Sequence, residues 1–173
     1  MIKYVKGDAT DPVGEGNKLI IHCCNNRNKW GKGFVLAISS KWKSPELEYR
    51  GWANGGLWMG RRFELGEIQP VRVKHDIYVV NMIGQKDYIS LNIKIGDKHV
   101  QYAPVRYGAV EECLLRVAKF AIENKASVHA PRICSGLAGG SWAIIEEIIE
   151  RVLCNNGISV TVYDFGENPN YNP

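Results

Sequence analysis

The stretch IHCCNNRNKWGKGFV, residues 21–35, decides how this chain folds, because an apolar strand pattern leads into polar side chains and then into a glycine turn. Gly31 and Gly33 can adopt backbone angles closed to other residues, and without a Cβ atom they let main-chain amides approach an anion closely. Residues 34–38 have a helical pattern, so the first amides of that helix add partial positive charge at the same place. The stretch predicts a phosphate site, although such a turn can also be only a tight connection.

A second glycine cluster, APRICSGLAGGSW at residues 130–142, has the same design. It follows an apolar strand pattern and precedes a helical pattern that is rich in isoleucine between residues 144 and 153. Two units of strand, glycine loop and helix in one domain predict that both loops flank a single pyrophosphate. The alternative is that these glycines only close connections between strands and helices.

The composition indicates one domain. The chain has 173 residues, of which 45% are hydrophobic, and this is enough for a single buried core. No apolar run reaches the ~18 residues of a membrane span, and no basic-then-apolar leader is seen. We therefore expect no membrane association, no secretory signal, and a cytoplasmic or nuclear location.

The cysteines and the charge narrow the choice of ligand. Five cysteines are an odd number, and Cys23 and Cys24 lie inside a strand pattern, so a disulfide framework is not expected. No Cys/His spacing is typical of zinc, and we expect neither a metal nor a cofactor. The net charge of +4 is spread along the chain, which favours an anionic small molecule over nucleic acid.

The periodicity of the remaining sequence predicts an α/β fold. Strands alternate with helices, and several strands are too apolar to have a wet face. A helix is predicted around residues 45–50, with a loop over 52–58, and an exposed hairpin is predicted from 89–93 and 99–102. Residues 166–173 have the composition of a disordered tail. The predicted strands are Ile2–Val5, Leu19–Cys23, Ile68–Val73, Ile77–Met82, Val128–Ile133 and Ile158–Tyr163, and the predicted long helices cover 110–121 and the region after Ser141.

Four motifs in this order resemble those of a macrodomain. They are Gly7-Asp8 after the first strand, His22-Cys23-Cys24-Asn25 with Trp30-Gly31-Lys32-Gly33, Ser135-Gly136-Leu137 with Trp142, and Val160-Thr161-Val162-Tyr163. More narrowly, the chain is similar to the branch with ADP-ribose-1″-phosphate phosphatases and the terminal ADP-ribose protein glycohydrolase. The resemblance implies a three-layer α/β/α macrodomain with a central mixed sheet over residues 1–165, followed by the tail.

The resemblance also implies where ADP-ribose binds. Asp8 would accept a hydrogen bond from the adenine amino group, Phe165 would lie against the adenine face, and Asn25 would contact the distal ribose. From the residues alone, Asp8 can also be a turn or helix-cap aspartate, Phe165 can also be a ring folded onto the core, and Asn26 is the local competitor of Asn25. The remaining binding residues that the resemblance implies are Ala9, Gly31, Lys32, Gly33, Phe34, Val35, Ser135, Gly136, Leu137, Ala138 and Gly139.

The candidate catalytic residues are His22 and Asn25, which the resemblance implies, and Lys32. Lys32 replaces a glycine that the family often has in this loop, and it can either bind the extra 1″-phosphate or only point to solvent. His22 occupies a position with a proposed catalytic role in the phosphatase branch, but a strand histidine is ordinarily a hydrogen-bonded core residue. The glycohydrolase relatives carry a catalytic aspartate directly after the Gly-Leu of the second loop, where this chain has Ala138, and Lys86 lies near the family lysine. This departure favours the phosphatase activity or a domain that only binds.

We therefore expect a monomeric, metal-independent hydrolase that converts ADP-ribose-1″-phosphate to ADP-ribose and phosphate. Its small-molecule partner would be ADP-ribose or ADP-ribose-1″-phosphate. One alternative is an ADP-ribose reader module without catalysis. The other is a hydrolase that removes ADP-ribose from modified macromolecules, which would then be its partners.

Overall fold

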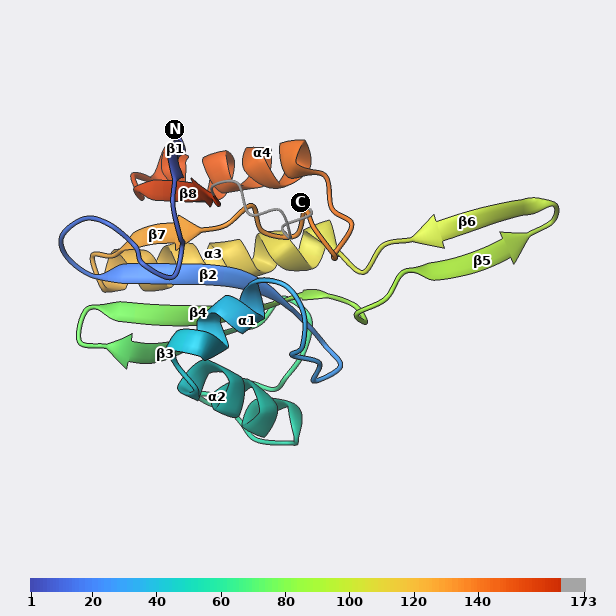
Figure 1. The fold of residues 1–173 in the computed structure, drawn as a ribbon, viewed down its shortest axis with the longest axis horizontal. Coiled ribbons are helices and arrows are strands. Elements are labelled where there is room, and N and C mark those ends of the chain that lie inside the picture. The colour runs from blue at the N-terminus through green and yellow to red at the C-terminus, as the bar shows by residue number, and fades with distance from the viewer. Residues whose placement is uncertain (166–173) are drawn as a thin grey trace.

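A computed structural model describes residues 1–165, and its centre is a six-stranded sheet with the order β1-β8-β7-β2-β4-β3 (Figure 1). The pairs β1–β8, β8–β7, β7–β2 and β2–β4 are parallel, and β3 is antiparallel to β4. The mixed sheet was predicted, and it is confirmed. The strands are β1 (Lys3–Lys6), β2 (Lys18–Asn25), β3 (Ile68–Lys74), β4 (Ile77–Gln85), β7 (Ser127–Ala130) and β8 (Val160–Asp164).

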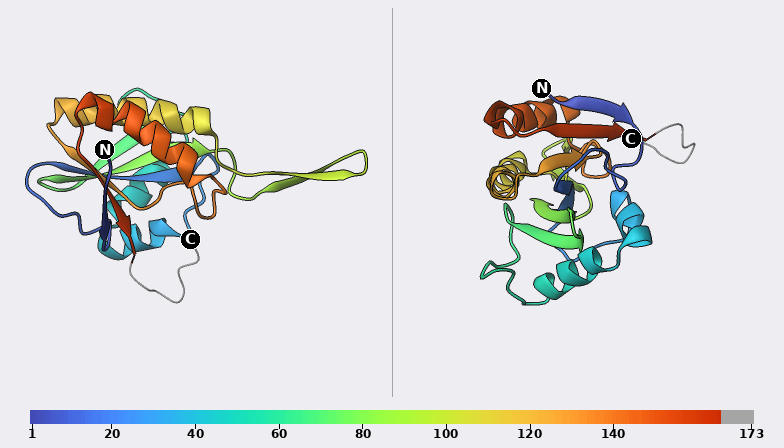
Figure 2. Two further views of the ribbon diagram at one scale, coloured as in Figure 1. Left: turned by 90° about the horizontal axis from the view of Figure 1, so that it is seen from above. Right: turned by 90° about the vertical axis from the view of Figure 1, so that its left-hand side faces the viewer.

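Helices cover both faces of this sheet and give three layers. One face carries α3 (Tyr107–Glu123) and α4 (Trp142–Val152), and the other carries α1 (Phe34–Lys41) and α2 (Ser44–Ala53). Figure 2 shows the two helical layers on opposite sides of the sheet. A short 3₁₀ helix, Cys154–Asn156, follows α4. The three-layer α/β/α arrangement is the one that the sequence predicts.

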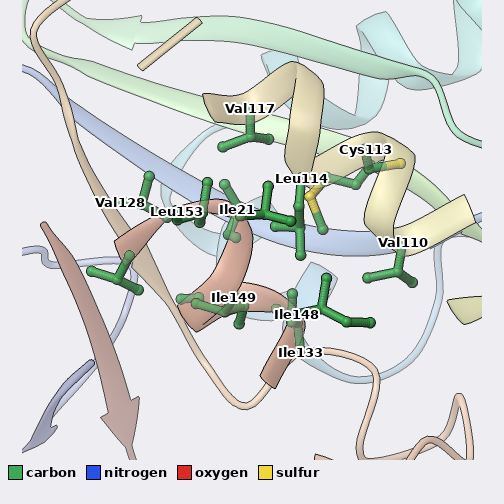
Figure 3. Packing of buried hydrophobic residues seen from close by; sticks show 14 of the residues in the cluster. Ile21, Val110, Cys113, Leu114, Val117, Val128, Ile133, Ile148, Ile149 and Leu153 are labelled. Carbon is green, nitrogen blue, oxygen red and sulfur yellow. The ribbon is translucent and has the colours of Figure 1, made fainter. Parts of the chain in front are cut away.

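Two hydrophobic clusters hold the layers together, one on each face of the sheet. Alternation along β2 divides its side chains between them, because Ile21 packs with α3 and α4 whereas Ile20 packs with α1 and α2. Figure 3 shows Ile21 among Leu114 of α3 and Ile148 and Ile149 of α4. The central strands are thus buried on both faces, as parallel strands normally are.

Several predicted element boundaries need correction. β2 and β4 extend beyond their predicted ends at Cys23 and Met82, to Asn25 and Gln85. The strand expected over Val128–Ile133 is β7 and ends at Ala130, because the chain turns at Pro131, which has no amide hydrogen for a sheet. The strand expected from Ile158 is β8 and begins at Val160. Residues 52 and 53, predicted to start a loop, instead form the last turn of α2.

The predicted hairpin is confirmed as β5 (Leu91–Ile95) and β6 (Lys98–Tyr102), which project away from the rest of the molecule (Figure 1). Leu91 pairs with Tyr102 and Ile93 with Val100, so one face of the hairpin is apolar. No side chain between residues 88 and 102 is buried. Within residues 1–165, no helix combines the length and the apolar character needed to cross a membrane. The predicted tail, 166–173, lies outside the described residues.

Candidate functional site

A cleft of about 620 Å³ lies at the edge of the sheet where the parallel strands end. Such an edge is the usual ligand site of open α/β sheets, and this volume is typical of small-molecule sites. The lining comes from segments far apart in sequence that follow β1, β2, β4, β7 and β8. The lining residues are Gly7, Asp8, Ala9, His22, Cys23, Lys32, Gly33, Phe34, Val35, Leu36, Ala37, Gln85, Pro131, Arg132, Ile133, Cys134, Gly136, Leu137, Ala138, Tyr163 and Phe165.

The first glycine loop presents free amides to this cleft. Gly33 is the residue before α1 and has φ 80° and ψ −147°, a combination that is essentially restricted to glycine. No side chain caps this helix, and the amide of Leu36 donates to the Gly33 carbonyl at 3.1 Å. Within residues 1–165, the amides of Phe34 and Val35 have no acceptor. The start of α1 therefore offers two hydrogen-bond donors and the positive end of the helix dipole.

The second glycine loop is held in shape by its own main chain. The amide of Gly139 donates to the Gly136 carbonyl at 2.9 Å, and the amide of Gly140 donates to the Cys134 carbonyl at 2.8 Å. The amide of Val105 donates to the Ala138 carbonyl at 3.1 Å and ties the loop to the segment before α3. In the described part of the chain, the amides of residues 136 to 138 are without acceptors, so this loop also offers hydrogen-bond donors to a ligand.

The two loops face each other, as the sequence predicts. A Cβ atom placed on Gly33 would lie 3.8 Å from Cδ1 of Leu137 in the second loop. Gly33 and Gly136 also line the same cleft. Main-chain donors from two separate loops thus converge on one space, which is the arrangement that binds a diphosphate.

One end of the cleft is formed by the segments that follow β1 and β8. Oδ1 of Asp8 accepts from the amide and the hydroxyl of Thr10 at 2.8 and 2.7 Å, so Asp8 does stabilise a turn. Its second oxygen, Oδ2, has no partner within residues 1–165 and stays available to a ligand. Phe165 lines this end and is 49% exposed, so its ring is not part of the core.

Arg132 also lines the cleft, although it was not among the predicted binding residues. Its guanidinium forms a two-point ion pair with Asp164, with distances of 2.6 and 3.0 Å. The same group lies over the rings of Tyr4 and Trp142 at 5.0 and 5.2 Å from the ring centroids. These contacts fix the position of the arginine side chain. Its place inside the second glycine cluster was the feature of the sequence that could have identified it as a cleft residue.

His22 lies at the floor of the cleft and is only 2% exposed. Nδ2 of Asn81 donates to the carbonyl of Pro45 at 3.1 Å and to Gln69, so Oδ1 of Asn81 must be the acceptor for Nε2 of His22 at 2.6 Å. The ring therefore carries its proton on Nε2 and leaves Nδ1 unprotonated. Burial lowers the pKa of His22 to about 4, so the imidazole is neutral at pH 7.

Asn25, which the resemblance places on the distal ribose, does not line the cleft. Its Oδ1 accepts from the amides of Arg27 and Lys29 and from the hydroxyl of Tyr49, at 3.0, 3.1 and 3.0 Å. Its Nδ2 donates to the carbonyl of Lys29 at 2.7 Å. The side chain is thus engaged in shaping the loop after β2. The predicted residues Gly31, Ser135 and Gly139 also lie off the lining.

Apart from Asp8, Arg132 and Lys32, the lining of the cleft has no Asp, Glu, Lys or Arg side chain among the described residues. Ala138 is buried against it and Lys32 is exposed at its rim, whereas Lys86 is exposed and lies off the lining. The neighbour of Lys86, Gln85, lines the cleft instead, and sequence analysis missed it. Asp8 supplies the one carboxylate among the described lining residues. Residues 1–165 contain no cluster of three or more His, Cys, Asp or Glu side chains suited to a metal ion.

The fold and the cleft together define an α/β protein in which two glycine loops converge at the edge of a mixed sheet. A macrodomain protein from Streptomyces coelicolor is 46% identical to the chain, with a TM-score of 0.78, and the match covers 96% of this chain and 100% of that one. The chain belongs to the macrodomain family. A protein of unknown function from Bacteroides thetaiotaomicron is 49% identical, with a TM-score of 0.85, over 95% of this chain and 98% of its own.

Curated relatives are more distant. An ADP-ribose 1″-phosphate phosphatase from Candida albicans is 25% identical over 155 residues, which cover 87% of this chain and 93% of the relative. A chromodomain-helicase-DNA-binding protein 1-like from Danio rerio is 30% identical over 167 residues, or 94% of this chain. The chain spans 15% of that relative's length and 18% of its Mus musculus counterpart. No family model matches the sequence.

Proposed function

We propose that the cleft binds ADP-ribose and that the protein hydrolyses ADP-ribose-1″-phosphate to ADP-ribose and phosphate. The observation that carries the binding proposal is the convergence of two sets of free main-chain amides, from residues 34–35 and 136–138, on one cleft. The diphosphate would accept hydrogen bonds from these amides. Adenine would lie between Phe165 and Asp8, whose Oδ2 would accept from the amino group.

The hydrolysis that we propose adds water to the substrate and releases inorganic phosphate. Breaking the bond between the anomeric carbon and oxygen leaves the electron pair on the phosphate, so donors that neutralise its oxygens lower the barrier. Lys32, exposed at the rim of the cleft, is the available cation. The Candida albicans relative with the phosphatase name supports this substrate. Ala138 supports it too, because this position offers no carboxylate for acid or base catalysis.

His22 would serve as the base in this reaction. Its Nδ1 is unprotonated because Nε2 donates to Asn81, and the neutral ring can accept a proton from water. We expect kcat to stay level between pH 8 and pH 5, because the pKa of about 4 keeps the ring neutral over this range. Rates of phosphate release across this range would check the expectation. A fall in kcat centred near the ordinary histidine pKa of 6.5 would contradict it.

A reader module without catalysis is the second candidate. Two observations favour it: His22 is almost completely buried, and Asp8 is the one carboxylate among the described lining residues. Isothermal titration with ADP-ribose tests the binding proposal, and absence of heat would refute it. Phosphate release from ADP-ribose-1″-phosphate tests the enzymatic proposal. Binding without phosphate release would leave the reader module, and release of ADP-ribose from a modified protein or DNA oligomer would identify a macromolecular substrate.

A further inference from the structure

The side chain that the resemblance assigns to the distal ribose is already occupied. All four of the short contacts of the Asn25 amide, from 2.7 to 3.1 Å, are made within the protein, to Arg27, Lys29 and Tyr49. The residue is buried, and it is absent from the lining of the cleft. A carboxamide in this state has little capacity left for a sugar hydroxyl.

A second carboxamide, that of Gln85, lies on the cleft at the end of the neighbouring strand β4. Cys24 pairs with Ile83 and Asn25 with Gln85, so Gly84 is the extra residue of a β-bulge. A Cβ atom on Gly84 would lie 2.7 Å from Sγ of Cys23 and 2.9 Å from Cγ2 of Val110, so only glycine fits there. A bulge redirects the side chain that follows it, and here the redirected side chain is Gln85.

The side-chain carboxamide of Gln85 has no hydrogen-bond partner in residues 1–165. Only its main chain is engaged, since its carbonyl accepts from the amide of Asn26 at 3.0 Å. The side chain is half-buried, and both Oε1 and Nε2 remain free. It can therefore accept one hydrogen bond and donate another to the same ligand.

The strand order says which part of ADP-ribose would reach this amide. From one edge of the sheet inward, the order is β1, β8, β7, β2 and β4. Asp8 follows β1 and Phe165 follows β8, whereas the two glycine loops follow β7 and β2. With adenine at the first pair of strands and the diphosphate at the second, the distal ribose falls at β4.

We infer that Gln85 binds the vicinal hydroxyls of the distal ribose and so distinguishes ADP-ribose from nucleotides that lack this sugar; the inference rests on the proposed binding of ADP-ribose. One hydroxyl donates to Oε1, and the other accepts from Nε2. Gln85 thereby takes the role that the resemblance gives to Asn25. A carboxamide does not exchange protons at neutral pH, so its contribution is to hold the sugar in place and not to transfer a proton.

The test compares ADP-ribose with ADP, which shares adenine and diphosphate but lacks the distal ribose. In Gln85→Met, which keeps the volume of the side chain and removes both polar atoms, we expect the Kd for ADP-ribose to rise about tenfold, as for the loss of two modest hydrogen bonds. The Kd for ADP should stay unchanged. The matched control is Lys86→Met at the adjacent residue, which lies off the cleft and should change neither constant.

Failure of the inference about Gln85 can be distinguished from failure of the proposed ADP-ribose binding. An unchanged Kd for ADP-ribose in Gln85→Met overturns the inference, and so does an equal rise for ADP-ribose and ADP, which would indicate a structural role. If the wild-type protein binds neither ligand, the proposed function itself fails. Should Asn25→Ser remain folded by circular dichroism and lose affinity for ADP-ribose alone, the sugar-binding role returns to Asn25 and the inference about Gln85 is refuted.

Discussion

Lowering the pH from 6.5 to 4 is expected to remove about 5 kcal/mol from the free energy of unfolding through two buried histidines, His22 and His129. Burial lowers the pKa of each to about 4 from an ordinary value of 6.5. Well above pH 6.5 both rings are neutral in the folded and unfolded chains, so they have no effect. Between pH 6.5 and 4 only the unfolded chain takes up these protons, and the folded state is progressively disfavoured. Below pH 4 the effect is complete.

This loss is a large fraction of the stability of a typical domain, about 5–15 kcal/mol. It is measured by urea unfolding at a series of pH values between 7 and 4. His129 contacts Ser127 and Tyr163 at 2.8 Å, and His129→Gln keeps a polar side chain beside them. This variant should lose about half of the part of the pH dependence that comes from the two histidines. His99→Gln is the control at an exposed position of the hairpin and should keep the pH dependence of the wild type. Equal pH dependence in His129→Gln and the wild type would contradict the explanation.

Replacing Gly33 with valine is expected to weaken ADP-ribose binding by at least a hundredfold. Its φ of 80° and ψ of −147° are strained for any residue with a Cβ atom, and the branched side chain would extend toward Leu137, which is already 3.8 Å from the Cβ position. Relief of this strain turns the amides of Phe34 and Val35 away from the cleft. Losing two hydrogen bonds to a charged group costs about 3 kcal/mol or more, which corresponds to a factor of more than a hundred in Kd.

The control for this variant is Gly31→Val, two residues earlier in the same loop. A Cβ atom on Gly31 meets no atom within 4 Å, and Gly31 does not line the cleft. Calorimetric titration of both variants with ADP-ribose checks the expectation, and circular dichroism confirms that the helices remain. Equal affinities in the two variants would show that the amides at the start of α1 do not bind the ligand.

Much of the fold follows from local patterns in the sequence. Apolar strands identified a covered sheet, and the face of α3 that contains Val110, Leu114 and Val117 is buried, as its spacing predicts. The two glycine loops identified the cleft, because main-chain amides in a glycine turn between a strand and a helix often have no acceptor within the protein and so can bind a ligand. Strand ends were less accurate, since Pro131 stops pairing inside a run of residues that still looks apolar.

The arrangement of side chains in the cleft depends on contacts that no local pattern reveals. Asn25 is held by Tyr49, which lies 24 residues away in α2. Gln85 reaches the cleft because the bulge at Gly84 fits against Val110 of α3. Both are tertiary effects. Because of them, the side chain of Asn25 on β2 stabilises the following loop, whereas the side chain of Gln85 on the neighbouring β4 lines the cleft.

The projecting hairpin of β5 and β6 has a consequence for how this fold can be altered. Because no side chain from 88 to 102 is buried, its removal would leave the interior untouched. The chain on either side is already fastened, since the amide of Lys86 donates to the carbonyl of Pro104 at 2.9 Å. The arm is therefore a natural point at which a tag, a fluorophore or a whole guest domain can be inserted without rebuilding the host.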